Sequence, residues 1–182
     1  DIAQSISDSV SNTLTREDIA NYKAEWKEPL GLNIFGYDAW TSQPPTQGYL
    51  TLTTLKAYEM IQAEEYNLHQ LIEMYRIFAS DRDNILYDYQ DKLEDFVGTD
   101  LNYIEEKMKL YNPQQSELFN FPKPHGGGTA YMNAVDKNGF GVSLIQSNFH
   151  GIGSRIGVGD YGFFLHNRGC GFNLDQQHPN FL

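Results

Sequence analysis

The sequence predicts an α+β protein, with a mostly helical part at residues 1–112 and a β-rich part from residue 129 onward. Two observations predict this division. Before residue 112 the apolar residues mainly recur every three or four positions, which is the spacing of a helix face. Glycine is concentrated later, since 12 of the 16 glycines lie between Gly126 and Gly171. Glycine weakens helices and is common in turns, so the last third is expected to form strands and loops.

The first elements are expected to be short. Residues 2–11 have a helical pattern, and Thr15 can cap a second short helix, with Asp18 in the place of a capping-box acid. Residues 29–42 alternate between apolar and other residues on either side of Gly36. That pattern predicts a β-hairpin with its turn at this glycine.

Longer helices are expected to follow. A Pro-Pro-Thr-Gln-Gly break precedes a helix at about 48–62, and a second helix is expected over 66–80. Its expected apolar face consists of Leu68, Leu71, Ile72, Tyr75 and Phe78. Further helical pattern covers about 88–97 and 100–111. Residues 113–128 are rich in Pro, Asn and Gln and are expected to form an exposed, mobile connector.

The part from residue 129 is expected to begin with a hairpin. Residues 129–136 form the first strand, Lys-Asn-Gly at 137–139 the turn, and residues 140–147 the second strand. A glycine-rich loop at 151–159 and a third strand at 161–165 are expected next.

Composition excludes several classes of function. The formal net charge is −11, with 20 acidic and 9 basic residues in 1–112 and four of each in 113–182. Without a basic patch, nucleic acid and anionic membranes are not expected as partners. No apolar run approaches the roughly 20 residues that span a bilayer. The single Cys170 excludes an intrachain disulfide and a cysteine-based zinc site, and no metal-ligand spacing is present at His125, His150, His166 and His178.

The segment with the most chemical information is Gly-Gly-Gly followed by Thr129, at the start of the predicted first strand. A chain cut directly before a threonine leaves that residue's own α-amine as a base for its hydroxyl. The amine titrates near 7.7–8.0 and needs no histidine partner. Glycines before the cut permit the strained backbone of an N-to-O acyl shift at the Gly128 carbonyl. The alternative is that the glycines only form a flexible entry into a strand.

Other segments resemble the landmarks of one family, in the same order. They are Leu14-Thr15-Arg16-Glu17-Asp18-Ile19-Ala20 with Tyr22, Glu28-Pro29, Pro44-Pro45-Thr46-Gln47-Gly48, Leu68-His69 with Ile72-Glu73, Ala79-Ser80-Asp81-Arg82-Asp83, Thr129 with Val135-Asp136-Lys137-Asn138-Gly139, Asn167-Arg168-Gly169 with Gly171-Phe172, and His178-Pro179-Asn180. Over nearly the whole chain they resemble the gamma-glutamyltransferase family of N-terminal-nucleophile (Ntn) amidohydrolases. The last two segments are similar to its gamma-glutamyltransferase-like branch.

The resemblance implies roles for particular residues. Thr129 would be the nucleophile, exposed by self-cleavage after Gly128. Ser147 would be the hydroxyl that hydrogen-bonds the nucleophile, although it could equally be an ordinary strand serine. Asn167 and Arg168 would lie in the segment that meets the substrate. Asp81 and Asp83 could be an acid pair, but a hydrogen-bonded corner at a helix end is the favoured interpretation.

The resemblance also implies properties of the whole protein. The chain resembles the middle portion of the family, from the end of the large subunit into the start of an αββα sandwich at about residue 129. Two subunits would come from one precursor, with a small-molecule amide substrate and no cofactor, and this portion alone is expected to be inactive. The sequence leaves the compartment open, with a cytoplasmic location favoured over a periplasmic or extracellular one.

The substrate is less well defined, because this sequence departs from the family pattern. Gamma-glutamyltransferases have an acidic pair where this chain has Cys170 and Gly171, and Arg168 replaces a neutral amide. Losing an anion and gaining a cation should favour a substrate carboxylate and disfavour an α-ammonium group. The alternatives are a gamma-glutamyl amide such as glutathione, a non-glutamyl amide of the oxamate or acylase kind, and a non-catalytic relative with a binding or structural role.

Overall fold

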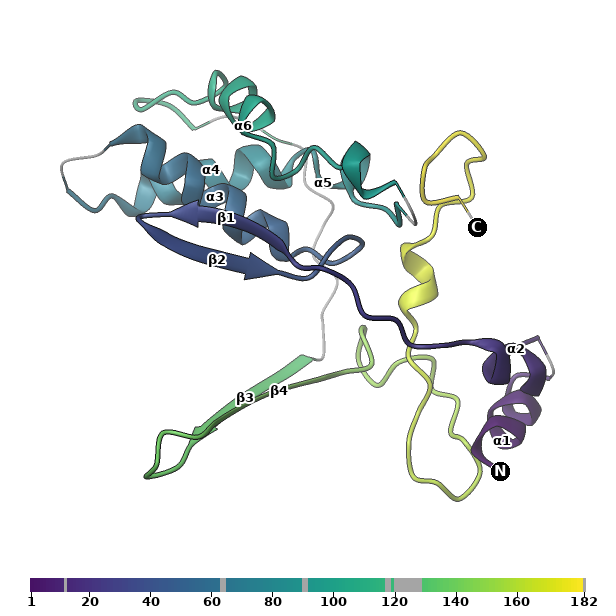
Figure 1. Cartoon of the computed structure of the whole chain (residues 1–182). Helices are drawn as coiled ribbons and strands as arrows, with labels where there is room; N and C mark the ends of the chain where they lie inside the picture. The colour runs from purple at the N-terminus through teal and green to yellow at the C-terminus, as the bar shows by residue number, and fades with distance from the viewer. Residues whose placement is uncertain (12, 63–64, 90–91, 117–118, 120–128, 182) are drawn as a thin grey trace. The chain divides into compact units, whose positions relative to one another are not determined.

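The structure is a computed structural model that describes residues 1–11, 13–62, 65–89, 92–116, 119 and 129–181 (Figure 1). Contacts divide the chain into two compact units. The helical unit consists of Trp26–Pro122 and Gln176–Asn180, and the hairpin unit of Asp1–Glu25, Lys123–Asp175 and Phe181–Leu182. Most of the predicted connector at 113–128 lies outside the described residues. The cleavage residue Gly128 also lies outside them.

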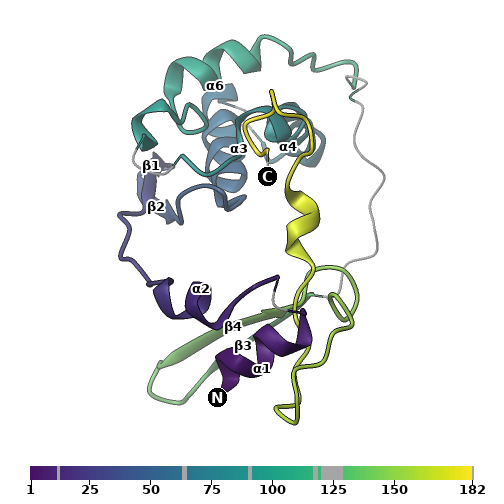
Figure 2. The same cartoon turned by 90° about the vertical axis from the view of Figure 1, so that its right-hand side faces the viewer.

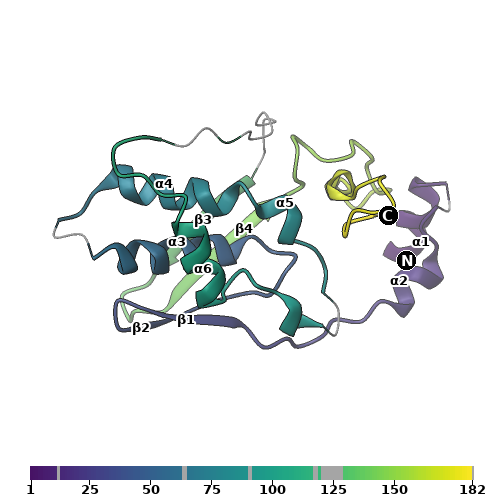
Figure 3. The ribbon, with the colours of Figure 1, turned by 90° about the horizontal axis from the view of Figure 1, so that it is seen from above.

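The helical unit contains a hairpin and a group of helices. Its elements are β1 (Leu30–Ile34), β2 (Tyr37–Thr41), α3 (Gly48–Ile61), α4 (Leu68–Ala79), α5 (Arg82–Ile85), the 3-10 turn η1 (Leu93–Asp95) and α6 (Leu101–Met108). The predicted hairpin is confirmed, with Phe35 and Gly36 both at positive φ between antiparallel strands. Two central residues at positive φ match the twist of the flanking strands. Figures 1 and 3 show α3 and α4 side by side, with the hairpin along α3.

The core of the helical unit lies between α3, α4 and α6. It is formed by Tyr49, Leu50, Ala57, Met74, Ile77, Phe78, Tyr89, Phe96 and Ile104. The rings of Tyr49 and Phe96 meet edge to face with centroids 5.2 Å apart. Inside the same region the Thr53 hydroxyl donates a buried hydrogen bond of 2.6 Å to the Gly98 carbonyl. Apolar burial and this paired carbonyl hold the start of α6 against α3.

The predicted apolar face of α4 is wrong in most positions. Leu68, Ile72 and Tyr75 are exposed, whereas the buried residues are Glu73, Met74, Ile77 and Phe78. The physical reason is that α4 contacts both α3 and α6, so its buried stripe is set by two neighbours. The sequence also did not predict that Glu73 is buried, with its carboxylate paired to the Arg76 guanidinium.

The helix predicted over 88–97 does not form. The described residues of this segment contain only η1, and α5 precedes it. Tyr87 and Tyr89 stack with ring centroids 4.0 Å apart, and Tyr89 also meets Phe96. Side chains two positions apart cannot face each other on a helix, so this aromatic packing requires an irregular backbone.

The corner between α4 and α5 is hydrogen-bonded, as favoured from the sequence. The Asp81 carboxylate accepts from the Asn84 amide at 2.9 Å, the Lys107 ammonium at 2.8 Å and the Tyr103 hydroxyl at 3.1 Å. Burial raises the pKa of Asp81, but these three donors outweigh it and hold the pKa below its ordinary value. Asp83 is paired separately with Arg82, so the two acids do not share a site.

The hairpin unit begins with two short helices, α1 (Ile2–Ser9) and α2 (Arg16–Asn21), which pack against each other (Figure 2). The predicted capping box is confirmed. The Thr15 side chain accepts from the Asp18 backbone N–H, and the Asp18 carboxylate accepts from the Thr15 backbone N–H. None of the described helices in either unit is both long enough and apolar enough to cross a bilayer.

The second hairpin pairs β3 (Thr129–Val135) with β4 (Gly141–Ser147), as predicted. Its turn is held by the Asp136 carboxylate, which accepts from the backbone N–H groups of Asn138 at 2.8 Å and Phe140 at 2.9 Å. Gly139 supplies a positive φ of 82°. Because side chains alternate between faces, this turn determines which residues meet along the whole hairpin.

The third strand predicted at 161–165 is wrong. The chain instead folds back on itself, with backbone hydrogen bonds such as Val158 N–H to the Phe163 carbonyl and a single bridge between Gly157 and Phe164. Gly159 and Gly162 adopt positive φ and interrupt the extended backbone. The predicted glycine-rich loop is therefore present, and the segment after it continues the same irregular structure.

Candidate active site

Thr129 and Ser147 are opposite each other at the open end of the β3–β4 hairpin. Paired residues of an antiparallel ladder project their side chains from the same face. The Thr129 hydroxyl donates a hydrogen bond of 2.8 Å to the Ser147 hydroxyl. The two residues predicted as nucleophile and hydrogen-bond partner are thus in direct contact, 18 positions apart in the sequence.

The Ser147 hydroxyl is held from its other side by the next segment of the chain. It also accepts the backbone N–H of Phe149 at 3.0 Å, and Phe149 has a positive φ of 77°. With two donors directed at it, the serine oxygen has a restricted rotamer. Thr129 therefore donates to a fixed acceptor, which orients its own oxygen.

Arg168 reaches the same region from the 3-10 turn η2 (Arg168–Gly171). Its Nη2 donates a long hydrogen bond of 3.4 Å to the Ser147 carbonyl. Its guanidinium lies over the Phe149 ring, 5.4 Å from the centroid, within the range of a cation–π contact. A positive charge thus lies beside Ser147, the residue that contacts the candidate nucleophile.

Asn167 holds the loop that carries these contacts. Its backbone N–H donates to the Asn148 carbonyl at 3.2 Å, and its side-chain oxygen accepts from the His150 N–H at 3.0 Å. Its side-chain nitrogen donates to the carbonyls of His150 at 3.3 Å and Gly153 at 3.2 Å. In this structure Asn167 joins residues 148–153 to the start of η2, and so positions Arg168.

Among the predicted site residues, contacts join Thr129, Ser147 and Arg168, and Asn167 supports them through the loop. Gly128 lies outside the described residues. Phe149 was missed by the sequence analysis. An aromatic residue two positions after the candidate serine is a weak signal, because its role depends on a positive φ that a non-glycine residue rarely adopts.

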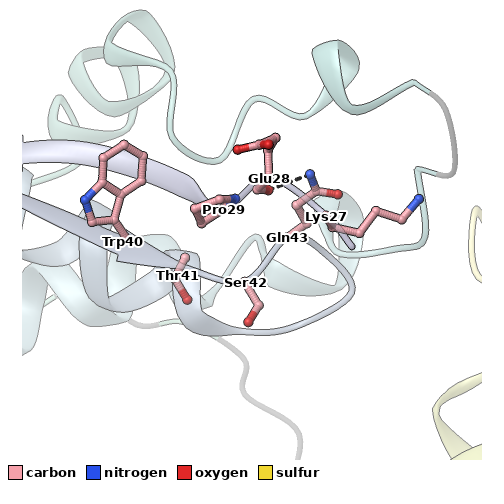
Figure 4. Close-up of a pocket in the computed structure, with 7 residues that line it drawn as sticks. All are labelled: Lys27, Glu28, Pro29, Trp40, Thr41, Ser42 and Gln43. Carbon is pink, nitrogen blue, oxygen red and sulfur yellow. Dashed lines mark hydrogen bonds between the residues drawn. The ribbon is translucent and has the colours of Figure 1, made fainter. Parts of the chain in front are cut away.

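Other parts of the described chain offer weaker sites. A groove of about 340 Å³ in the helical unit is lined by Lys27, Glu28, Pro29, Trp40, Thr41, Ser42 and Gln43 (Figure 4). The Gln43 amide donates across it to the Glu28 carbonyl at 2.7 Å, and none of its residues is a candidate nucleophile with a base. Within the described residues no group of three His, Cys, Asp or Glu side chains could hold a metal ion. Cys170 is exposed.

Comparison with known proteins identifies the family. The sequence profile of gamma-glutamyltranspeptidase matches residues 1–182. The chain belongs to the gamma-glutamyltranspeptidase family. It is 32% identical to the glutathione hydrolase-like YwrD proenzyme of Bacillus subtilis, covering 100% of this chain and 36% of that protein. It is 28% identical to the oxamate amidohydrolase proenzyme of Klebsiella pneumoniae, covering 91% of this chain and 32% of that protein.

A solved structure agrees with this assignment. The cephalosporin acylase of Bacillus halodurans matches with a TM-score of 0.78 and 30% identity, over 100% of this chain and 34% of that one. The chain thus spans about a third of the length of the gamma-glutamyltranspeptidase relatives that it matches. Family members are Ntn-type hydrolases and transpeptidases, and the curated relatives are proenzymes. The predicted family resemblance is confirmed.

Proposed function

We propose that the intact protein is an Ntn amidohydrolase or acyltransferase whose nucleophile is Thr129, exposed by self-cleavage of the Gly128–Thr129 bond. The observation that carries the proposal is the 2.8 Å hydrogen bond from the Thr129 hydroxyl to Ser147, at the first residue of a strand that follows three glycines. The proenzyme names of the relatives support it.

Self-cleavage would proceed through an ester. The Thr129 hydroxyl oxygen attacks the Gly128 carbonyl carbon, the peptide C–N bond breaks, and the nitrogen gains the hydroxyl proton to become an amine. Water then hydrolyses the ester, which leaves a carboxylate on Gly128 and a free hydroxyl on Thr129. The hydrogen bond to Ser147 favours this step because it fixes the position of the attacking oxygen.

Turnover would repeat the same attack on a substrate amide. The new α-amine, with an ordinary pKa of about 7.7–8.0, accepts the hydroxyl proton near neutral pH. It returns the proton to the leaving nitrogen, and the acyl group remains as an ester on Thr129. Water or an acceptor amine then releases the acyl group. No step in this scheme requires a metal or an organic cofactor.

The same proposal extends to the architecture. Residues 1–112 and the connector at 113–128 would end the large subunit, and residue 129 would begin the small one. Both faces of the β3–β4 hairpin carry exposed apolar side chains, Met132 and Leu144 on one face and Tyr131 and Ile145 on the other. A sheet with two apolar faces is stable when it is covered on both, as in the inner layers of an αββα sandwich.

Two classes of amide fit the relatives. A gamma-glutamyl amide such as glutathione would follow the glutathione hydrolases, and a non-glutamyl amide would follow the oxamate amidohydrolase or the cephalosporin acylase. The neighbourhood of Arg168 favours the second class. Cys170 and Gly171 offer no carboxylate to an α-ammonium group, and the nearby charge is a cation.

Mass analysis of the intact precursor tests the proposal. The smaller product is expected to begin with Thr-Ala-Tyr-Met, and amide hydrolysis is expected to depend on its formation. Thr129→Ala should remove both cleavage and turnover, whereas Thr129→Ser should retain part of each because the hydroxyl is kept. A precursor that stays uncut after prolonged incubation and hydrolyses no amide would instead identify a non-catalytic relative.

A further inference from the structure

The Arg168 guanidinium has hydrogen-bonding capacity that the described chain does not use. It carries five N–H donors, and among the described residues its only side-chain hydrogen bond is the 3.4 Å contact to the Ser147 carbonyl. Among the described residues no carboxylate lies within ion-pair distance of it. Arg168 is also exposed, so a ligand can approach it. A guanidinium in this state is suited to bind a carboxylate through two parallel hydrogen bonds.

The position of this cation relates it to the reaction. Its hydrogen bond ends on Ser147, and the side chain of the same residue accepts the hydrogen bond of Thr129. The path from the guanidinium to the nucleophilic oxygen consists of these two hydrogen bonds and Ser147 between them, so the distance is about 10 Å or less. A small acyl group whose carbonyl is at Thr129 can therefore place a second charged group at Arg168.

The Arg168 guanidinium is covered on one face, and the residue that precedes Arg168 is held in place. The Phe149 ring covers one of its faces, with 5.4 Å between the central carbon and the ring centroid. Asn167, the preceding residue, is held to the 148–153 loop by one backbone and three side-chain hydrogen bonds. A planar group with one face covered presents its edge, and the edge carries the N–H donors.

We propose that Arg168, supported by Phe149, binds a free carboxylate on the acyl part of the substrate. The preferred substrates are then monoamides of small dicarboxylic acids that lack an α-ammonium group. Neutral amides lack the anion, and an α-ammonium group is repelled by the guanidinium. This inference rests on the proposed function, because it places the carboxylate relative to an acyl group on Thr129.

The test uses the self-cleaved intact protein and matched pairs of amides. The acids are oxamate, malonamate, succinamate and glutaramate, each paired with its neutral diamide, and glutamine is added as glutaramate with an α-ammonium group. Ammonia release gives kcat/KM. We expect at least one acid to exceed its diamide about tenfold or more, and glutaramate to exceed glutamine.

Arg168→Gln tests the residue itself. Because the variant loses hydrogen bonds between charged groups, kcat/KM for the best acid should fall about 10- to 150-fold. The kcat/KM for its neutral diamide should change less than about threefold. Phe149→Leu should give an intermediate loss on the acid, because the cation keeps its charge but loses its support. Arg155→Gln is the matched control, an exposed arginine of the glycine-rich loop that should leave the ratio of acid to diamide unchanged.

Three results would overturn the proposal. They are a wild-type protein that does not distinguish acids from diamides, an Arg168→Gln variant that loses both equally, and glutamine or glutathione as the best substrate. Self-cleavage separates this failure from failure of the proposed function. Arg168→Gln should still cut itself to the wild-type masses, whereas absence of cleavage in the wild type would remove the Thr129 mechanism.

Discussion

Ser147 illustrates how one hydroxyl in this chain can position another. It accepts hydrogen bonds from the Thr129 hydroxyl and the Phe149 backbone, at 2.8 and 3.0 Å. Ser147→Ala removes the acceptor and leaves the Thr129 side chain free to rotate. A neutral hydrogen bond contributes about 0.5–1.5 kcal/mol, so kcat of the intact protein should fall about 2- to 13-fold with little change in KM.

Ser143→Ala is the control for this prediction. Ser143 lies on the same face of β4 and donates to the Tyr131 hydroxyl at 3.1 Å, without contact to Thr129. It should leave kcat near the wild-type value. Equal losses in the two variants would mean that any serine on this face supports the hairpin, and Ser147 would have no separate role.

Asp81 gives a prediction about pH. Burial raises its pKa, but the donors Asn84, Lys107 and Tyr103 lower it further than burial raises it. A carboxyl with a lowered pKa in the folded state stabilises the fold above its ordinary pKa of 3.8, and this contribution is lost as pH falls through the folded-state value. Asp81→Asn should therefore lower the free energy of unfolding by about 1–2 kcal/mol at pH 7.

Urea unfolding at pH 7 and at pH 3 measures this effect. The difference between wild type and Asp81→Asn should shrink at pH 3, because this pH lies below the ordinary pKa of 3.8 and the stabilisation by the charged carboxylate decreases as the pH falls toward the lowered folded-state pKa. Asp83→Asn is the comparison, because that acid has a 62% exposed side chain and, within the part of the chain that the structure describes, pairs only with its neighbour Arg82. If the difference in the free energy of unfolding between wild type and Asp81→Asn does not depend on pH, the shape of the side chain and not its charge stabilises this corner.

Regular structure accounts for the contact between Thr129 and Ser147, whereas irregular structure carries the residues that support it. The family resemblance implied that Ser147 contacts Thr129, and the hairpin with the Lys-Asn-Gly turn places the two residues opposite each other. The support from Phe149 and Asn167 depends on positive φ angles and on bonds between loop segments. No periodic pattern in the sequence reports such contacts.

The loop at 148–167 leads directly into Arg168, and Gly153 is the glycine of this loop with the least room for a side chain. It has a φ of +85°, and a Cβ there would collide with the Leu165 carbonyl oxygen at 2.3 Å and lie 3.1 Å from the His166 Cα. Its own carbonyl accepts from Asn167 at 3.2 Å. Gly153→Ala should therefore open the loop, raise hydrogen exchange in peptides covering 148–167, and reduce activity through displacement of Arg168.

Gly151→Ala separates the effect of a positive φ from the effect of a collision with the Leu165 carbonyl. Gly151 also has a positive φ, of 56°, but has open space around it. Its substitution should cost about 1–2 kcal/mol or less from the backbone alone and leave most of the exchange pattern intact. If both variants exchange alike, the contact with Leu165 has no part in holding the loop.

At the scale of elements, the sequence predicted local structure better than packing. The capping box at α2, the β1–β2 turn and the existence of α4 follow from neighbouring residues, and each is confirmed. The face of α4 that is buried depends on two partner helices, so periodicity selected the wrong stripe. The aromatic packing of Tyr87 and Tyr89 likewise replaced a helix that local pattern favoured.

Across the whole molecule, burial is divided unevenly between the two units. Of the buried hydrophobic residues in the described chain, only Val158 belongs to the hairpin unit, and the others lie in the helical unit. The β3–β4 hairpin, which carries the candidate nucleophile, is exposed along both strands except at Ser147. The sequence could indicate the family because its motifs are local, whereas the burial of a strand face depends on residues outside the hairpin.

This contrast predicts a hydrogen-exchange pattern for the 182-residue chain. A two-stranded hairpin without a covered face is marginally stable in water, so the amides of β3 and β4 should exchange within about seconds to minutes. The amides of α3 and α4, which surround the core, should exchange most slowly.

In the intact protein, the proposed sandwich should slow exchange in β3 and β4 at least about 100-fold and change exchange in α3 and α4 much less. Mass spectrometry of peptides from both proteins gives the comparison. A hairpin that is already as protected as α4 in the 182-residue chain, or one that stays unprotected in the intact protein, would contradict an inner-layer position for β3 and β4.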